Sequence, residues 1–373
     1  MTIVIDKKYW NRVTFGDVVI NVNKTTNNPL SDGIDRFVGL DHLQSGELKV
    51  NRFGDTAEGV TFTKVVSHGQ TLFGKRRAYQ RKVAFADFRA VCSGDILTFA
   101  PKNETLLEDY LPFLVMSEGF FKKALSTSAG SLSPRTRWSD LAKFEFLLPP
   151  IEEQRKIAHL LWLMENHKRN LQQLNSTVEK LRSSFIESTF NGDIDLPGKE
   201  ARSFKALAEC AIVLRGATIT KKEVSPGDVP VVAGGKNPAY FHSVSNRNDR
   251  CITISASGAN AGYINRWDTP IWASDCTTVQ AKLPAEFPFD YIYTFLISQQ
   301  ETIYRRLRKG SAQPHVYSSE IEKLRIPVFN PSEQRAISDE YSNYSAAITG
   351  IEQEILTLRN LFTSTLASIF GEV

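Results

Sequence analysis

The chain has 373 residues, which is enough for two ordinary domains or one large one. Hydrophobic residues make up 42% of it and charged residues 23%, a composition typical of globular protein that argues against disorder. The formal net charge of +4 is too small to indicate nucleic-acid binding by itself. It is compatible with a DNA-binding protein whose basic residues are concentrated locally.

The four cysteines, Cys92, Cys210, Cys251 and Cys276, are widely separated, and no two have the close spacing of a zinc site. We therefore expect isolated reduced thiols and no bound metal. The N-terminus has no apolar segment after a basic start, and the chain has no run of about 18 apolar residues. These features predict neither export nor a membrane span. Together with the reduced thiols they indicate the cytoplasm.

Residues 1–149 predict a first globular region of mixed α and β structure. The polar, turn-rich stretch at 23–33 predicts a loop. The short apolar run at 95–99, bounded by turn residues, predicts a strand. An apolar stripe at helical spacing predicts a helix at 110–125.

The strongest basic cluster of the chain lies within this region. It contains Lys75, Arg76, Arg77, Tyr79, Arg81 and Lys82. Five positive charges in eight residues can neutralise several phosphates, and an arginine among them could bind guanine through two hydrogen bonds. A solvated, charged strand or loop would have the same composition.

Residues 150–197 predict a long helix followed by a linker. Its apolar positions recur in steps of three and four, as in a heptad repeat: Ile157, Leu160, Met164, His167, Leu171, Leu174, Val178, Leu181 and Phe185. Pro149, Pro150 and the acidic pair Glu152 and Glu153 mark the start of the helix. Because such a seam is ordinary core packing, we expect His167 to be a packed histidine and no ligand.

Residues 198–328 predict a second globular region, and residues 329–373 predict a second long helix. Short apolar runs at 250–254 and 277–281 predict strands, and residues 289–307 predict a helix. Asn330 is a suitable cap for the final helix. Its expected seam consists of Ile337, Tyr341, Tyr344, Ile348, Ile351, Ile355, Leu358 and Phe362. The polar stretch 191–202 is the expected linker between the first helix and this region.

The two halves of the chain repeat one plan. Residues 130–190 match residues 310–370 at a constant offset of 180, without a gap. The identical pairs include Gly130/Gly310, Ser131/Ser311, Pro134/Pro314, Lys143/Lys323, Glu153/Glu333, Gln154/Gln334, Arg155/Arg335, Ile157/Ile337, Gln173/Gln353, Leu181/Leu361 and Phe190/Phe370. Two similar seams in one chain can bury each other. We therefore expect an antiparallel coiled coil that separates the two globular regions, with an internal pseudo-two-fold axis.

At this point the sequence resembles a known family, the specificity subunits of Type I restriction-modification systems. The segment Phe146-Leu-Leu-Pro-Pro-Ile-Glu-Glu-Gln-Arg-Lys-Ile-Ala158 is similar to the family's conserved-region signature. The second copy, at 324–337, is similar but degraded, with Phe329-Asn330 in place of the two prolines. Segments at 38–42, 72–83 and 91–97, and at 230–235, 258–264 and 271–275, resemble the family's target-recognition domains more loosely. The resemblance covers essentially the whole chain.

The resemblance implies an α+β fold with two target-recognition domains, at 1–149 and 198–328. The conserved helix and linker at 150–197 and the C-terminal helix at 329–373 would separate them. It further implies a non-catalytic subunit that binds an asymmetric, interrupted site in double-stranded DNA. The family binds two adenine methyltransferase subunits and can thereby recruit motor-nuclease subunits. We expect no cofactor of the chain's own.

The loops before each conserved strand are further candidates for DNA contact, because they occupy equivalent positions in the two copies. The first loop carries Arg135 and Arg137 after Gly130, and the second carries Gln313 and His315 after Gly310. A purely structural turn would also explain them. Weaker candidates in the second region are Asn260, Tyr263, Asn265 and Arg266, since amide side chains suit adenine edges but are also common in turns.

The chain shows no complete catalytic motif. The stretch 69–75 resembles a phosphate-binding loop, but Arg76 stands where Ser or Thr is needed for magnesium. The spacing of Asp41, Glu47 and Lys49 is too common to indicate a nuclease. We find neither an Asn-Pro-Pro-aromatic motif nor a glycine-rich cofactor loop. Two alternatives to a specificity subunit remain, a nuclease or methyltransferase of a related system and a coiled-coil scaffold that does not bind DNA.

Overall fold

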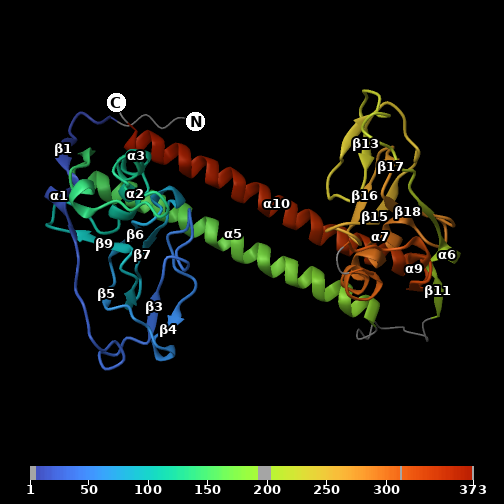
Figure 1. Cartoon of the computed structure of the whole chain (residues 1–373), viewed down its shortest axis with the longest axis horizontal. Coiled ribbons are helices and arrows are strands. Elements are labelled where there is room, and N and C mark those ends of the chain that lie inside the picture. Colours follow the sequence, from blue (N-terminus) through green and yellow to red (C-terminus); the bar gives the residue numbers. More distant parts are fainter. Residues whose placement is uncertain (1–5, 192–202, 311–312, 372–373) are drawn as a thin grey trace. The chain divides into compact units, whose positions relative to one another are not determined.

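The computed structural model describes residues 6–191, 203–310 and 313–371. The chain divides into two compact units, one made of Met1–Gln172 and Gln353–Val373 and the other of Gln173–Glu352. Each unit combines short strands with short helices. The long helices α5 (Ile151–Asn191) and α10 (Pro331–Phe370) contribute residues to both units (Figure 1).

The first unit contains two four-stranded sheets and a separate pair of strands. One sheet is antiparallel, with the order β2 (Val19–Asn21), β9 (Ile96–Pro101), β6 (Thr71–Gly74), β7 (Val83–Phe85). The other has the order β4 (Gly54–Asp55), β3 (Arg36–Val38), β8 (Ala90–Cys92), β5 (Lys64–Val66), and β3 is parallel to β8. Strand β1 (Asn11–Thr14) pairs with β10 (Glu145–Leu148). The short helices are α1 (Phe15–Val18), η1 (Thr56–Glu58), η2 (Ala78–Gln80), α2 (Leu111–Val115), α3 (Glu118–Ser126) and α4 (Trp138–Leu141).

The second unit repeats this plan. Its four-stranded sheet has the order β12 (Ala211–Arg215), β18 (Cys276–Ala281), β15 (Cys251–Ser255), β16 (Ile264–Trp267). Its second sheet has the order β14 (Tyr240–His242), β13 (Val229–Val232), β17 (Trp272–Ala273), and β13 is parallel to β17. Strand β11 (Phe204–Ala206) pairs with β19 (Arg325–Pro327). The short helices are α6 (Leu207–Cys210), α7 (Phe289–Ser298), α8 (Gln300–Thr302), the π-helical η3 (Ile303–Leu307) and α9 (Ser318–Ile321).

The expected strands at 95–99, 250–254 and 277–281 are confirmed as β9, β15 and β18. The expected helix at 110–125 was wrong in one respect, because two helices occupy it. The chain breaks at Ser117, whose extended backbone and side-chain oxygen, bonded to Phe120 N, begin α3. The expected helix at 289–307 is likewise divided into α7, α8 and η3. The expected linker, except for Asn191, lies outside the described residues.

The glutamine of the duplicated Glu-Gln-Arg segment has the same function in both copies. Gln154 is buried and its Nε2 donates to Pro149 O at 2.8 Å, while Gln334 is buried and its Nε2 donates to Phe329 O at 2.7 Å. A buried amide needs such partners, and here they tie the start of each long helix to the strand before it. Asn330 caps α10 as expected, since its Oδ1 accepts from Glu333 N at 2.9 Å.

The helices α5 and α10 run antiparallel. His167 Nε2 lies 3.2 Å from Glu354 Oε1, and the rings of Phe185 and Tyr344 are 5.9 Å apart. Residue numbers thus rise along α5 while those of their partners on α10 fall. The expected seam of α10 is confirmed, because all eight of its residues are buried or half-buried.

The expected seam of α5 was partly wrong. Ile157, Met164, Leu171, Val178 and Phe185, spaced by seven residues, are buried or half-buried. The alternate positions are exposed: Leu160, His167, Leu174 and Leu181. The inward face of the helix contains polar residues instead, with Glu165 and Lys168 buried. His167 is consequently no packed histidine but a half-exposed one that meets Glu354.

Candidate nucleic-acid interface

The basic cluster forms a tight turn that leaves β6. Lys75 N donates to Asp95 O at 3.0 Å, and Arg77 N donates to Pro134 O at 2.8 Å. Thr136 N returns a hydrogen bond to Lys75 O at 3.2 Å. The turn is therefore joined to the loop of Arg135 and Arg137. Arg135 is 60 residues after Lys75 in the sequence, but the fold brings the loop beside the turn.

That loop has the same construction in both units. Ala129 and Arg135 exchange backbone hydrogen bonds of 3.1 and 2.9 Å, and Lys309 and His315 exchange bonds of 2.9 and 2.8 Å. Both loops are entered through a glycine with positive φ, 114° at Gly130 and 93° in the second copy. A left-handed turn of this kind suits glycine, which explains the residue at this position.

The turn that meets the loop is also duplicated, at an offset of 181. In the second unit Ala256 N donates to Asp275 O at 3.1 Å, Gly258 N to Pro314 O at 3.0 Å, and Val316 N to Ala256 O at 2.9 Å. These are the counterparts of the three bonds made by Lys75, Arg77 and Thr136. Both units thus present one backbone platform, a turn clamped to a hairpin loop.

The two turns differ in side chains at their left-handed positions. Gly258 and Gly262 have φ of 80° and 89°. Their counterparts in the first unit are Arg77 and Arg81, with φ of 55° and 51°. A non-glycine residue in this region is strained by about 1–3 kcal/mol. Two strained arginines in one turn favour a functional role for at least one of the side chains.

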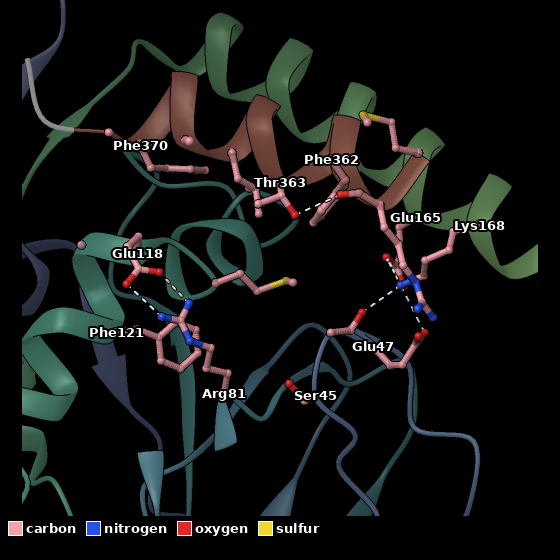
Figure 2. A pocket seen from close by; sticks show the side chains of 18 of the residues that line it. Ser45, Glu47, Arg81, Glu118, Phe121, Glu165, Lys168, Phe362, Thr363 and Phe370 are labelled. Carbon is pink, nitrogen blue, oxygen red and sulfur yellow. Dashed lines mark hydrogen bonds and ion pairs between the residues drawn. The ribbon is translucent and has the colours of Figure 1, made fainter. Parts of the chain in front are cut away.

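Arg77 and Arg81 are used differently. Arg81 donates to both carboxylate oxygens of Glu118, at 2.6 and 2.8 Å, and stacks over Phe121 (Figure 2). These hydrogen bonds raise the pKa of Arg81 and lower the pKa of Glu118. Among the described residues Arg77 has no side-chain hydrogen bond or ion pair, and it is exposed. Lys82 donates to Leu40 O at 2.5 Å, and Tyr79 is exposed.

Asp95 holds two of the predicted arginines. Its carboxylate accepts from Arg135 Nε at 2.8 Å and from Arg76 Nη1 at 3.4 Å. The hydrogen bond with Arg135, opposed by partial burial, lowers the pKa of Asp95 and raises the pKa of Arg135. Arg76 also donates to Ser133 Oγ at 3.2 and 3.0 Å, so it is held both by Asp95 and by the hairpin loop.

A basic hollow of about 630 Å³ lies beside the ion pair of Asp95 and Arg135. Lys64, Lys75, Arg135 and Arg137 line it, together with Asn21, Asn23, Gly94, Leu97, Ala129, Thr136 and Trp138. No acidic residue is among these lining residues. Burial lowers the pKa of Lys64, whose Nζ donates to Ile96 O at 3.1 Å. Sequence reasoning missed Lys64, Asn21 and Asn23, because nothing in their local sequence sets them apart from ordinary strand and loop residues.

A second cavity of about 760 Å³ separates the basic turn from the long helices within the first unit. Figure 2 shows Arg81 and Glu118 on one side of it and Phe362 and Phe370 of α10 on the other. At its end Lys168 Nζ contacts Glu165 at 2.9 Å, Glu47 at 3.2 Å and Gly46 O at 2.8 Å. This buried network joins the globular part of the unit to α5.

The candidates in the second unit are partly engaged with other residues. Arg266 donates to Asp268 at 2.8 Å and to Asp290 at 2.6 Å, and it lies over Phe289. Lys236 lies over the ring of Tyr263 at 5.2 Å. Asn260 O accepts from the backbone of Tyr263 within the turn. The loop presents an exposed Gln313 and a half-buried His315, whose ring stacks on Tyr317 at 6.3 Å.

Within the described ranges, no group of His, Cys, Asp and Glu side chains could hold a metal ion. The four cysteines are free and buried. No helix among the described residues has the length and apolar character needed to cross a membrane.

Comparison with known families agrees with this duplicated arrangement. The chain matches the family model of the Type I restriction modification DNA specificity domain twice, over residues 7–180 and 202–358. The chain belongs to this family. A curated relative, the specificity subunit of the Type I restriction enzyme EcoDI from Escherichia coli, is 24% identical over 191 residues. That match spans 50% of this chain and 42% of the relative.

Solved structures of similar fold cover nearly the whole chain. The S subunit of a Type I restriction-modification system from M. genitalium has a TM-score of 0.70 at 17% identity, over 98% of this chain and 96% of that one. A chain from a structure on the assembly and conformational transition of the Type I system has a TM-score of 0.60 at 15% identity. It covers 98% of each chain. At such identities the similarity establishes the fold.

Proposed function

We propose that this chain is a DNA sequence-specificity subunit of a Type I restriction-modification enzyme. It binds an asymmetric, bipartite site in double-stranded DNA through two target-recognition domains, at 1–149 and 198–328, and it has no catalytic site of its own. The observation that carries the proposal is the duplicated platform. The same backbone clamp presents Arg77 and Arg135 in one unit, but Gly258 and His315 at the equivalent positions of the other. The first loop also carries Arg137, and the second also carries Gln313.

Two equivalent backbone platforms that carry different side chains suit the recognition of two different half-sites. Arginines and lysines around the hollow of the first unit can bind phosphates and guanine, whereas an amide and an imidazole in the second favour other base edges. We expect the chain to act in the cytoplasm, together with the DNA that it would bind. The methyl-transfer chemistry would come from separate subunits.

Two modification subunits would bind to the long helices. In the first unit α5 exposes Leu160 and Leu163, and in the second unit it exposes Leu174 and Leu181. Exposed leucines at helical spacing suit a partner helix, because their burial is favourable by about 25 cal/mol per Å². One such surface in each unit accords with two adenine methyltransferases, through which motor-nuclease subunits could join.

DNA selection tests the first proposal. The purified full-length chain, alone and with its modification subunits, is mixed with a pool of randomised duplexes, and the bound fraction is sequenced. We expect two fixed half-sites separated by a spacer of constant length. Enrichment of no sequence, or of one uninterrupted site, would overturn the proposal. Methyl transfer by the rigorously purified chain alone would contradict its non-catalytic part.

Mass measurement of the assembly tests the second proposal. Replacing Leu160 and Leu163 by arginine should remove one modification subunit and leave the other bound. Leu30→Arg is the matched control, since Leu30 is equally exposed but lies in a loop far from α5 in sequence. Retention of both subunits by the double variant would show that they bind elsewhere.

A further inference from the structure

Asp95 occupies the point where the basic turn, the hairpin loop and strand β9 meet. Its backbone oxygen accepts from Lys75 N at 3.0 Å. Its side chain is 20% exposed, and its two carboxylate oxygens accept from Arg135 Nε at 2.8 Å, Arg135 Nη2 at 3.4 Å and Arg76 Nη1 at 3.4 Å. A single carboxylate therefore orients two of the guanidinium groups that the sequence predicts to contact DNA.

The second unit keeps the carboxylate and changes its partners. Asp275 follows Asp95 at the offset of 180 that relates the two loops, and its backbone oxygen accepts from Ala256 N at 3.1 Å. Its Oδ2 is hydrogen-bonded to the hydroxyl of Ser257, the residue that stands in the place of Arg76. The aspartate is therefore common to both units, whereas the side chains bonded to its carboxylate differ.

The held arginine keeps donors free for a ligand. Arg135 uses Nε and Nη2 on Asp95, and among the described residues its Nη1 has no hydrogen-bond partner. Arg135 also lines the basic hollow. A guanidinium fixed along one edge loses little conformational freedom when its other edge binds, so it can discriminate between bases by geometry.

We propose that Asp95 and Asp275 are positioning residues for DNA recognition, each orienting the side chains that contact its own half-site. This inference rests on the proposed function. The Asp95 carboxylate opposes the approach of phosphate groups while it fixes the arginines that read the first half-site. Its removal should therefore affect specific and non-specific binding in opposite directions, which loss of a merely structural contact would not do.

The experiment compares Asp95→Asn and Asp275→Asn in the full-length chain with its modification subunits. Competition between the selected duplex and single-base variants of each half-site measures discrimination. Titration against a duplex without the site, at several salt concentrations, measures non-specific binding. For Asp95→Asn we expect about tenfold weaker discrimination at the first half-site, which is within the range for one bidentate contact. Non-specific binding should become tighter and its salt dependence steeper, by up to about 0.9 in slope for each freed cation.

Asp275→Asn is the matched control. It should relax only the second half-site and leave the salt slope nearly unchanged, because the Ser257 hydroxyl that Asp275 holds has no charge. Arg135→Lys provides a second test that does not depend on the fold tolerating Asp95→Asn. Lysine keeps the charge but cannot form the two-pronged contact, so discrimination at the first half-site should fall while the slope stays constant.

Unchanged discrimination at the first half-site in both Asp95→Asn and Arg135→Lys would overturn the inference while leaving the proposed function intact. A loss of specific and non-specific binding together in Asp95→Asn would also overturn it, since that result describes a structural residue. If the parent chain itself selects no bipartite site, the proposed function and this inference both fail.

Discussion

Arg77 allows the strain in the basic turn to be separated from its function. The residue has a φ of 55°, and its counterpart Gly258 has a φ of 80° and open space where a side chain would begin. Arg77→Gly should relieve a backbone strain of about 1 kcal/mol or more. Glycine also increases the entropy of the unfolded chain, which offsets this gain by about 0.5–1 kcal/mol.

The two effects on stability nearly cancel, so we expect the melting temperature to shift by no more than about 2–4 °C. DNA binding should respond much more strongly. If the exposed guanidinium contacts one phosphate, its loss lowers the log–log salt slope by about 0.9. Between 50 and 200 mM salt, a difference of about 0.9 in slope changes the ratio of the parent's affinity to the variant's affinity by about 3.5-fold. The assay is a fluorescence-anisotropy titration with duplex DNA at five or so salt concentrations.

Arg81→Gly is the matched control, because Arg81 is also left-handed, with Gly262 as its counterpart. It removes a largely exposed ion pair with Glu118, which contributes about 0–1 kcal/mol to stability. We expect its salt slope to equal that of the parent. An unchanged slope in Arg77→Gly, or an equal loss in both variants, would refute the assignment of Arg77 as a residue that contacts DNA.

Lys168→Met should destabilise the fold by about 3–5 kcal/mol in urea unfolding, because it leaves the buried Glu165 carboxylate without its cation; a loss under 1 kcal/mol would show the network to be well solvated. Burial raises the pKa of Cys276 to about 12, so its thiol should resist an aromatic disulfide reagent at about pH 8 until the protein is unfolded, and fast labelling of the native chain would contradict the packing. The pKa of Asp95 is lowered in the folded state, so its stabilising effect is present above the unfolded pKa of about 3.9 and is lost as the pH falls through the folded pKa. The difference in melting temperature between the parent and Asp95→Asn should hence begin to shrink as the pH falls below about 4 and should go on shrinking as the pH falls through the lower folded pKa, and a constant difference would mean that the carboxylate is not the titrating group. Exchanging residues 203–309 for those of another family member should change one half-site only. Sequencing of the bound duplexes measures this, and a change in both half-sites would contradict independent recognition by the two domains.

The architecture could be predicted largely from the sequence. The constant offset of 180 predicted two copies of one plan, and both copies are present as equivalent sheets and clamps. Local signals also sufficed for the cap at Asn330 and for β9, β15 and β18. Such features depend on neighbours within a few residues or on repetition along the chain, and both are visible in a sequence.

Only the tertiary structure decided which side chains are free to act. The heptad pattern of α5 gave no means of telling Leu160, which is exposed, from Met164, which is buried, since burial depends on where α10 and the globular part cover the helix. Arg77 and Arg81 are four residues apart in one basic run. Of these two, Arg81 meets Glu118 from α3, whereas Arg77 meets no carboxylate in the part of the chain that the structure describes. Charge and periodicity can be read from the sequence. The contacts of each side chain depend on the fold, because long-range packing brings together residues whose local sequences do not indicate that they will meet.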